Sequence, residues 1–176
     1  MNQKHETWIN PKVEIRSSSI QGKGMFSLSD IPVGEKILLW GGESYTDSNG
    51  AREALKQGKF VMQWDDDIFS FEIDGEVEEP YTINHCCDPN TWMIDAYTLV
   101  ARRNVIQGEE ITADYAFWDN DISPNSSWLC NCGSEICRGK VTGNDWNLKE
   151  LQQRYKGHFS PLVNKLIDSQ NQCNPL

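Results

Sequence analysis

The chain has 176 residues, a formal net charge of −10, an isoelectric point near 4.7 and six cysteines. This length can bury one core without disulfides, and the acidic balance argues against nucleic-acid binding while favouring a Lys/Arg-rich peptide as partner. No window reaches the ~18 apolar residues of a membrane span, and residues 1–12 lack the apolar run of a secretory signal. We expect a soluble intracellular protein, in the cytoplasm or nucleus, whose cysteines are reduced.

The N-terminal part is typical of short strands separated by glycine turns. Strands are expected over residues 13–15, 25–28 and 36–40. After them, Ser48 and Asn49 can cap a short helix over residues 51–57, which Gly58 would end. The polar composition of this helix indicates an exposed insert.

Two hairpin-like units flank the centre of the chain. Residues 60–64 and 68–73 surround three aspartates and resemble an antiparallel pair with an acidic turn. Residues 97–103 alternate between apolar and polar side chains as a half-buried strand does, and a further strand is expected over residues 111–117. These units place the segment between them, residues 83–90, at the centre of the domain.

Residues 83–90 hold side-chain amides, a histidine, two thiols and an Asp-Pro turn in eight positions. Such a set of directional donors and acceptors on a rigid turn predicts a binding site. Two alternatives stay open from these residues alone. One is an ordinary loop around buried cysteines, and the other is a nucleophile pair in which His85 activates Cys86 or Cys87.

The C-terminal part changes character after a polar linker over residues 119–127, and we expect the hydrophobic core to end near there. Asp145 can cap a helix over residues 147–155. Ser160, followed by a proline, predicts a second helix over residues 162–168.

Cys130, Cys132 and Cys137 fall within eight residues. In a reducing compartment this spacing indicates metal ligands before it indicates disulfides. Three thiolates leave a tetrahedral zinc ion one ligand short, so a fourth ligand must come from elsewhere in the chain. The alternative is three buried thiols without a metal.

Five motifs follow one another along the chain: Gly22-Lys23-Gly24-Met25-Phe26, Trp40-Gly41-Gly42-Glu43, Ile83-Asn84-His85-Cys86-Cys87-Asp88-Pro89-Asn90, Gly108-Glu109-Glu110-Ile111-Thr112-Ala113-Asp114-Tyr115 and Cys130-x-Cys132-x4-Cys137-Arg138-Gly139. Together they resemble, in order, the signature blocks of the SET-domain protein lysine methyltransferases with a post-SET zinc segment. The resemblance implies a mainly β fold of several small sheets with a pseudoknot, a zinc-bound post-SET segment and C-terminal helices. It implies a SET domain over 13–117, a linker and post-SET segment over 118–139, and a helical extension over 140–176.

The resemblance also implies an activity, the transfer of a methyl group from S-adenosyl-L-methionine to a lysine amine of a protein or peptide, possibly histone-like. Asn84 and His85 match the family's cofactor-binding pair, the first through its side chain at the amino acid end and the second through its backbone at adenine. The glycines permit close backbone approach to the cofactor. The implied cofactor-binding residues are Gly22, Lys23, Gly24, Met25, Gly42, Asn84 and His85.

The family also suggests the missing zinc ligand. Its Asn-His-x-Cys block supplies the fourth cysteine, which here corresponds to Cys87, with Cys86 as the less favoured alternative. The implied ligands of a structural zinc are Cys87, Cys130, Cys132 and Cys137. Such a zinc would hold the post-SET segment in place and would not activate a nucleophile.

Tyr115 matches the catalytic tyrosine of the family. Its implied task is to aim a phenolic oxygen at the methyl group and the amine, in a displacement that depends on orientation. The substrate amine must be neutral to attack, and the sulfonium charge and desolvation both lower its pKa.

The lysine channel departs from the family's pattern, because several members carry tyrosine or another aromatic residue where this chain does not. The implied channel residues are Trp40, Met93, Ala113 and Phe117. With Ala113 small, we expect products beyond the monomethyl state. Trp118 could supply a further aromatic wall, and Lys140 stands where some members have an aromatic cover.

An acidic group precedes the central segment: Asp65, Asp66, Asp67, Glu76, Glu78 and Glu79. By resemblance this region holds the substrate peptide as an added strand, so these carboxylates could read its basic residues. The alternative is a solvated surface. For the whole protein, the rival functions are a catalytically silent SET-like module that binds a basic peptide, and a zinc-stabilised scaffold without cofactor.

Overall fold

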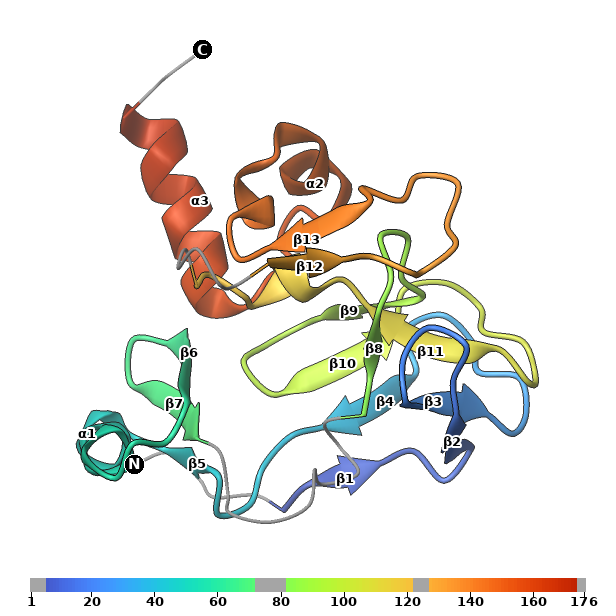
Figure 1. Ribbon diagram of the computed structural model, residues 1–176, viewed down its shortest axis with the longest axis horizontal. Helices are drawn as coiled ribbons and strands as arrows, with labels where there is room; N and C mark the ends of the chain where they lie inside the picture. Colours follow the sequence, from blue (N-terminus) through green and yellow to red (C-terminus); the bar gives the residue numbers. More distant parts are fainter. Residues whose placement is uncertain (1–5, 72–81, 122–126, 174–176) are drawn as a thin grey trace.

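This computed structural model describes residues 6–71, 82–121 and 127–173, and their strands form four small sheets (Figure 1). The first sheet has the strand order β1 (Trp8–Ile9), β4 (Lys36–Leu39), β10 (Thr98–Ala101) and β9 (Thr91–Met93). All of its pairings are antiparallel. The expected mainly β fold of several small sheets is confirmed.

The second sheet positions the central segment. Its order is β2 (Val13–Ser17), β3 (Lys23–Ser27), β11 (Glu110–Ala113) and β8 (Asn84–His85). The last pair is parallel, with His85 opposite Ala113. Residues 84 and 85 therefore lie beside the end of β11. The expected threading of this segment as a pseudoknot stays a prediction.

The insert forms a third sheet, in the order β5 (Tyr45–Thr46), β7 (Ile68–Phe71) and β6 (Val61–Asp65), with helix α1 (Ser48–Lys56) beside it (Figure 1). The predicted acidic hairpin is confirmed by the antiparallel pairing of β6 and β7. The predicted cap of α1 is wrong, because Asp47 takes that place. Its carboxylate accepts hydrogen bonds from the backbone N–H groups of Asn49 and Gly50, both at 3.0 Å.

The C-terminal part begins with a hairpin of β12 (Ser127–Leu129) and β13 (Lys140–Thr142), which brackets the cysteine loop. Three helices follow: the 3-10 helix η3 (Asp145–Asn147), α2 (Lys149–Arg154) and α3 (Pro161–Cys173). The prediction of one helix capped by Asp145 is wrong, because Leu148 has an extended conformation and divides it. The Ser160 cap is confirmed, since its hydroxyl accepts from the backbone N–H of Val163 at 3.3 Å.

The hydrophobic core does not end at the linker. Leu151, Tyr155 and Val163 are fully buried in the same cluster as the strands of the first two sheets. The ring of Phe117 lies 4.8 Å from that of Tyr155. The expected boundary is wrong because the apolar face of the C-terminal helices packs onto this cluster. Among the described residues, none of the helices combines the length and apolar character needed to cross a membrane.

Candidate active site

Tyr115 is held at its backbone and at its hydroxyl. The expected strand over 111–117 ends early, at Ala113, and the 3-10 helix η2 (Tyr115–Phe117) follows. The phenol donates to the carbonyl of Ile83 at 2.8 Å. Burial raises the pKa of Tyr115 to about 12, so the phenol stays protonated and able to donate near neutral pH.

His85 connects this tyrosine to the cysteines. The backbone N–H of Tyr115 donates to Nδ1 of His85 at 3.2 Å, so a neutral ring carries its proton on Nε2. Nε2 in turn lies 3.3 Å from Sγ of Cys87. Burial lowers the pKa of His85 to about 4, outweighing the carboxylate of Asp114, which acts to raise it. The neutral imidazole therefore bridges Tyr115 and Cys87.

Asn84 lies where the glycine turn before β3 meets β11. Its Nδ2 donates to the carbonyls of Gln21 and Lys23, at 3.1 and 3.0 Å, and to Glu110 Oε1 at 2.7 Å. A Cβ added at Gly24 would stand 2.2 Å from the same Glu110 oxygen and 2.9 Å from Nδ2 of Asn84, so a larger residue there would displace these hydrogen-bonded side chains. The amide nitrogen of Asn84 is thus committed to the protein, which leaves its oxygen as the atom to accept from a ligand.

Asn84, His85 and Tyr115 line one small depression, together with Ile20, Gln21, Trp128, Leu129, Cys130 and Asn131. The structure therefore brings together two predicted cofactor residues, the predicted catalytic tyrosine and one predicted zinc ligand, Cys130. Trp128, whose ring lies 5.7 Å from that of Tyr115, was missed by sequence reasoning. Its position two residues before the first clustered cysteine was the only signal.

The other implied cofactor residues do not line this depression, although Gly22 follows its lining residue Gln21 and the carbonyl of Lys23 accepts from Asn84. Lys23 and Met25 belong to β3, and Met25 is part of the core. Gly22 has a positive φ of 49° in the turn before β3. Gly42 has a φ of 83° and lies beside Thr7, whose Oγ1 would be 3.7 Å from an added Cβ. The positive φ values of Gly22 and Gly42 explain why glycine is favoured in these two turns.

The four implied channel residues are all buried. Trp40 packs against Trp64 and Trp118, with ring centroids 5.3 and 5.5 Å apart. Trp118 also lies 5.5 Å from Tyr115, so it connects Trp40 to the candidate catalytic residue. Phe117 packs against Tyr155 and Phe159 of the C-terminal part, with ring centroids 4.8 and 6.1 Å away.

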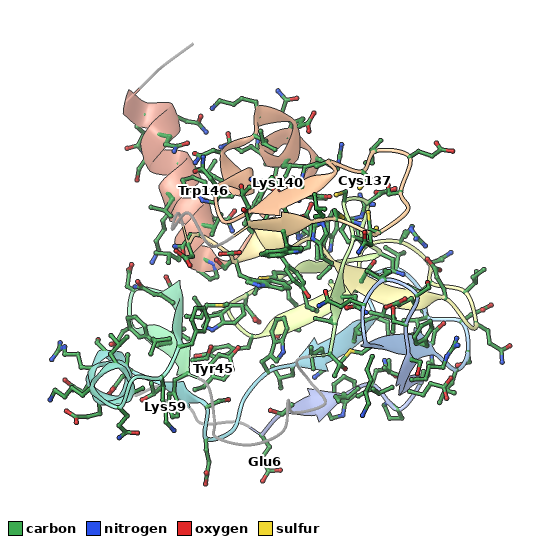
Figure 2. All side chains as sticks on the ribbon, in the orientation of Figure 1. Glu6, Tyr45, Lys59, Cys137, Lys140 and Trp146 are labelled. Atoms are coloured by element: carbon green, nitrogen blue, oxygen red, sulfur yellow. The ribbon has the colours of Figure 1, made fainter. Side chains whose placement is uncertain are left out.

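Met93 and Ala113 are fully buried at strand ends. Met93 donates its backbone N–H to the carbonyl of His158 at 3.3 Å. Ala113 accepts at its carbonyl from the backbone N–H of Cys86 at 2.9 Å. Lys140 is exposed at the start of β13, and Tyr45 is a buried residue of β5 in the third sheet (Figure 2).

The acidic hairpin has partners within the chain. Lys165 of α3 places its ammonium 2.5 Å from Asp65 and 2.6 Å from Asp66. Asp67 accepts from the backbone N–H of Ser48 at 2.9 Å. Glu76, Glu78 and Glu79 lie outside the described residues. A basic substrate residue would therefore have to compete with Lys165 for these carboxylates.

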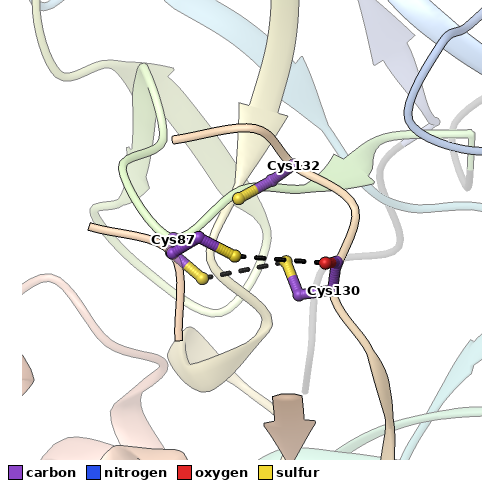
Figure 3. A group of neighbouring side chains, drawn as sticks. Cys87, Cys130 and Cys132 are labelled. Atoms are coloured by element: carbon purple, nitrogen blue, oxygen red, sulfur yellow. Dashed lines mark hydrogen bonds between the residues drawn. The ribbon is translucent and has the colours of Figure 1, made fainter. Parts of the chain in front are cut away.

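Cys87, Cys130, Cys132 and Cys137 bring their sulfurs within 4.8 Å of one another, and Figure 3 shows three of them pointing into a shared space. The sulfurs of Cys87 and Cys130 are 3.8 Å apart. Zinc bonds of about 2.3 Å place the sulfurs of a tetrahedron ~3.8 Å apart, so the cluster fits a structural zinc ion.

Backbone N–H groups point at two sulfurs of the cluster. The backbone N–H groups of Arg138 and Gly139 lie 3.3 Å from the sulfurs of Cys87 and Cys137 respectively. Burial acts to raise the pKa of Cys132, but backbone donors and neighbouring thiols lower it to about 7 overall. Backbone N–H donors of this kind stabilise metal-bound sulfur.

The alternative in which His85 activates a cysteine nucleophile has the required distance but not a thiol of low pKa. His85 and Cys87 do lie within hydrogen-bond distance. However, Cys87 is fully buried in the four-thiol cluster, and burial raises its pKa to about 11. Cys86 lies outside the cluster and accepts from the backbone N–H of Asp88 at 3.4 Å. Cys87 is therefore the better fourth ligand.

Comparison with known proteins agrees with this geometry. A family model described as "SET domain" matches residues 22–116. The chain belongs to the SET-domain family. It is 30% identical over 147 residues to the histone-lysine N-methyltransferase trithorax of Drosophila melanogaster, covering 72% of this chain and 4% of that protein. It is 28% identical over 193 residues to the histone-lysine N-methyltransferase ASHH3 of Arabidopsis thaliana, covering 94% of this chain and 51% of that protein.

A solved structure supports the fold. KRYPTONITE, crystallised in complex with mCHG DNA and SAH, matches with a TM-score of 0.55 and 22% identity, over 73% of this chain and 28% of that one. The chain spans about half or less of the length of the two relatives named above. Family membership and fold are therefore shared, while the activities of those longer proteins are a separate question.

Proposed function

We propose that the protein transfers a methyl group from S-adenosyl-L-methionine to the side-chain amine of a lysine in a protein or peptide. The observation that carries this proposal is the convergence of Asn84, His85 and Tyr115 on one depression at the end of β11. The histone-lysine N-methyltransferases among its relatives support the same reaction, and a histone-like protein is the substrate class to try first.

The cofactor would bind in the depression beside β8. The Asn84 oxygen would accept from the ammonium of the methionine part, while the backbone at His85 would meet adenine. The glycine turn before β3 would allow close approach. SAH in the KRYPTONITE structure supports a cofactor of this type. Trp128, which forms one wall of the depression, offers an aromatic face to the ligand.

Tyr115 would orient the reaction. Its neutral phenol lies at the depression, and because its proton is donated to the carbonyl of Ile83, its oxygen can accept from groups around the methyl carbon. The attacking lysine, whose ordinary pKa is ~10.4, loses its proton more readily beside a sulfonium and away from water. We therefore assign no separate general base.

The four cysteines would hold a zinc ion that supplies folding energy and no chemical step. By this proposal the SET domain covers residues 13–117, the linker and post-SET zinc segment residues 118–139, and the helical extension residues 140–176. The neutral His85 would then connect the zinc ligand Cys87 with Tyr115. The net charge of −10 supports a basic protein partner rather than nucleic acid.

The test is methyl transfer from labelled S-adenosyl-L-methionine to histones, other basic proteins and a lysate, with mass spectrometry of the products. Modified lysine in any protein supports the proposal. Binding of a basic peptide without methyl transfer, under conditions in which the cofactor binds, would support the silent module instead. Calorimetry that finds no cofactor binding would leave the zinc-stabilised scaffold.

A further inference from the structure

Two residues of the C-terminal extension contact the cysteine loop or the end of β11, although both lie outside the segment that the family model matches. Asp145, at the start of η3, accepts from Nε of Arg138 at 2.9 Å. Tyr155, directly after α2, places its hydroxyl 3.2 Å from the carbonyl of Cys87 and 3.3 Å from Asp114 Oδ2. Both side chains are buried. The extension thus contacts the cysteine cluster and the residue that precedes the candidate catalytic tyrosine.

Arg138 joins these contacts into one network. Its two terminal nitrogens donate to the two oxygens of Asp114, each at 2.7 Å, which is a bidentate ion pair. Asp114 is fully buried and the side chain of Arg138 is 10% exposed. Removing Arg138 would therefore leave two buried carboxylates, those of Asp114 and Asp145, without their counterion. Because Arg138 follows the cluster residue Cys137, the network also fixes the end of the cysteine loop.

Asp114 connects this network to the backbone at Tyr115. Its Oδ1 accepts from the backbone N–H of Ala116 at 3.1 Å and so caps η2, which begins at Tyr115. The carboxylate thus determines where β11 stops and in which direction the phenol leaves the backbone. A rotation of Asp114 would move the tyrosine hydroxyl away from its present contact with the carbonyl of Ile83.

We propose that the C-terminal extension is a positioning element of the methyl-transfer site, in which Asp145 and Tyr155 act through Arg138 and Asp114 on Tyr115. This inference rests on the proposed function for its kinetic consequences. Its structural part, the coupling between the extension and η2, stands independently of the reaction. Neither positioning residue touches the depression, so their effect is on orientation.

Orientation is the property that such a network can change most. A misplacement of about 1 Å far from the reacting atoms can cost ~10²-fold in rate. Lysine at position 138 would keep the positive charge but lose the planar fork that holds both oxygens of Asp114. Phenylalanine at position 155 would remove one hydroxyl and keep the ring packing against Phe117. Asparagine at position 145 would remove the charge facing Arg138.

The experiment compares three variants with the wild type in the full, zinc-loaded chain, using the best substrate from the methylation screen. Arg138→Lys should lower kcat ~10- to 100-fold, Asp145→Asn about tenfold and Tyr155→Phe ~2- to 10-fold. The KM for the peptide, cofactor affinity and zinc content should stay close to wild type. Lys149→Gln, which removes the hydrogen bonds of Lys149 to Gln152 and Asn171 in the same extension, is the matched control and should keep full activity.

Hydrogen exchange provides a measurement that does not depend on activity. Peptides over residues 110–118 should exchange faster in the three variants than in the wild type and in Lys149→Gln. If the wild type shows no methyl transfer, the proposed function is refuted. Faster exchange in the three variants would still support the coupling between the extension and η2. Unchanged kcat and unchanged exchange in Tyr155→Phe and Asp145→Asn would overturn the inference. Equal losses in those variants and in the control would overturn it too, because the effect would then be general destabilisation.

Discussion

The segment around Tyr115 and the acidic hairpin of the insert are attached to the rest of the protein in different ways. In the first, Tyr115 and Ala116 donate directional hydrogen bonds that His85, Ile83 and Asp114 accept, and all three acceptor residues are buried. The second meets α3 through Lys165, which is half exposed, and Asp66, whose side chain is 78% exposed. Exposed ion pairs contribute little to stability, whereas buried networks are costly to disturb.

This difference suggests a division of tasks. The proposed methyl transfer would need a fixed phenol and a fixed cofactor, and the buried network would provide that rigidity. Under the same proposal, recognition of different peptides would need a surface whose contacts can be exchanged, and the hairpin, with its exposed ion pairs, would offer such a surface. Changes in the buried region should therefore alter the rate strongly, while changes in the hairpin should alter peptide affinity by small factors.

The largest effect is expected from the cysteine cluster. Cys87→Ser or Cys130→Ser should abolish most activity and remove zinc, because three sulfurs cannot complete the tetrahedral site. Metal analysis and a methylation assay on the same preparation check this. Cys173→Ser, outside the predicted ligand set, is the control and should change little. Active wild-type protein without bound zinc would contradict the assignment.

The second-largest effect is expected from Tyr115→Phe. It should lower the rate on the order of 10²-fold or more, as when a hydrogen-bonding group that acts in the transition state is removed. Cofactor affinity should stay nearly unchanged. The pKa of Tyr115, raised to about 12 by burial, also predicts that the phenol does not titrate between pH 7 and 10. The rate in this range should therefore rise with pH as the substrate amine loses its proton, in parallel for both proteins. A pH profile measured at saturating cofactor tests both points.

Asn84→Ala should raise the dissociation constant of S-adenosyl-L-methionine more than tenfold, a loss of ~1.4 kcal/mol or more. The physical reason is the loss of the side-chain oxygen, together with the loss of its hydrogen bonds to the turn before β3. Isothermal calorimetry gives the constant directly. Normal binding by a folded Asn84→Ala protein would show that the cofactor lies elsewhere.

Products should run beyond monomethyl-lysine, because Ala113 is small, and Ala113→Tyr should restrict them. The rings of Trp40 and Trp118, which pack against each other, could limit the space for added methyl groups in place of residue 113. A time course followed by mass spectrometry distinguishes mono-, di- and trimethylated peptide. If the reaction halts at monomethyl-lysine and Ala113→Tyr changes nothing, the tryptophans and not residue 113 limit the width of the lysine channel.

The sequence predicted those parts of the site that are local in the chain. Asn84, His85 and Tyr115 stand in compact motifs, and the hairpin followed from its alternation and its acidic turn. The turn to a 3-10 helix at Tyr115 was missed, because a strand pattern does not reveal that Asp114 will cap the next three residues. The cap of α1 was placed late for a similar reason, since several neighbouring side chains can accept the same N–H groups.

Long-range contacts could not be predicted in the same way. Asp145 looked like a helix cap, but its carboxylate faces Arg138. Tyr155 looked like the last residue of that helix, but its hydroxyl reaches Asp114. Burial of a residue depends on which distant segment packs on it, and spacing along the chain carries no such information. Lys165 and the hairpin aspartates, about a hundred positions apart, illustrate the same limit.

The smallest effect is expected at Lys165, and it distinguishes the two regions most directly. Lys165→Gln should free Asp65 and Asp66 for a basic residue of the substrate and tighten binding of a Lys/Arg-rich peptide about 2- to 5-fold, with kcat unchanged. Lys56→Gln is the matched control, since it removes one positive charge and one exposed ion pair, that with Glu53 at 2.7 Å on α1. Peptide affinity measured at two salt concentrations should show a steeper salt dependence for Lys165→Gln alone. If both variants bind the peptide alike, the hairpin carboxylates form a solvated surface and the substrate is read elsewhere.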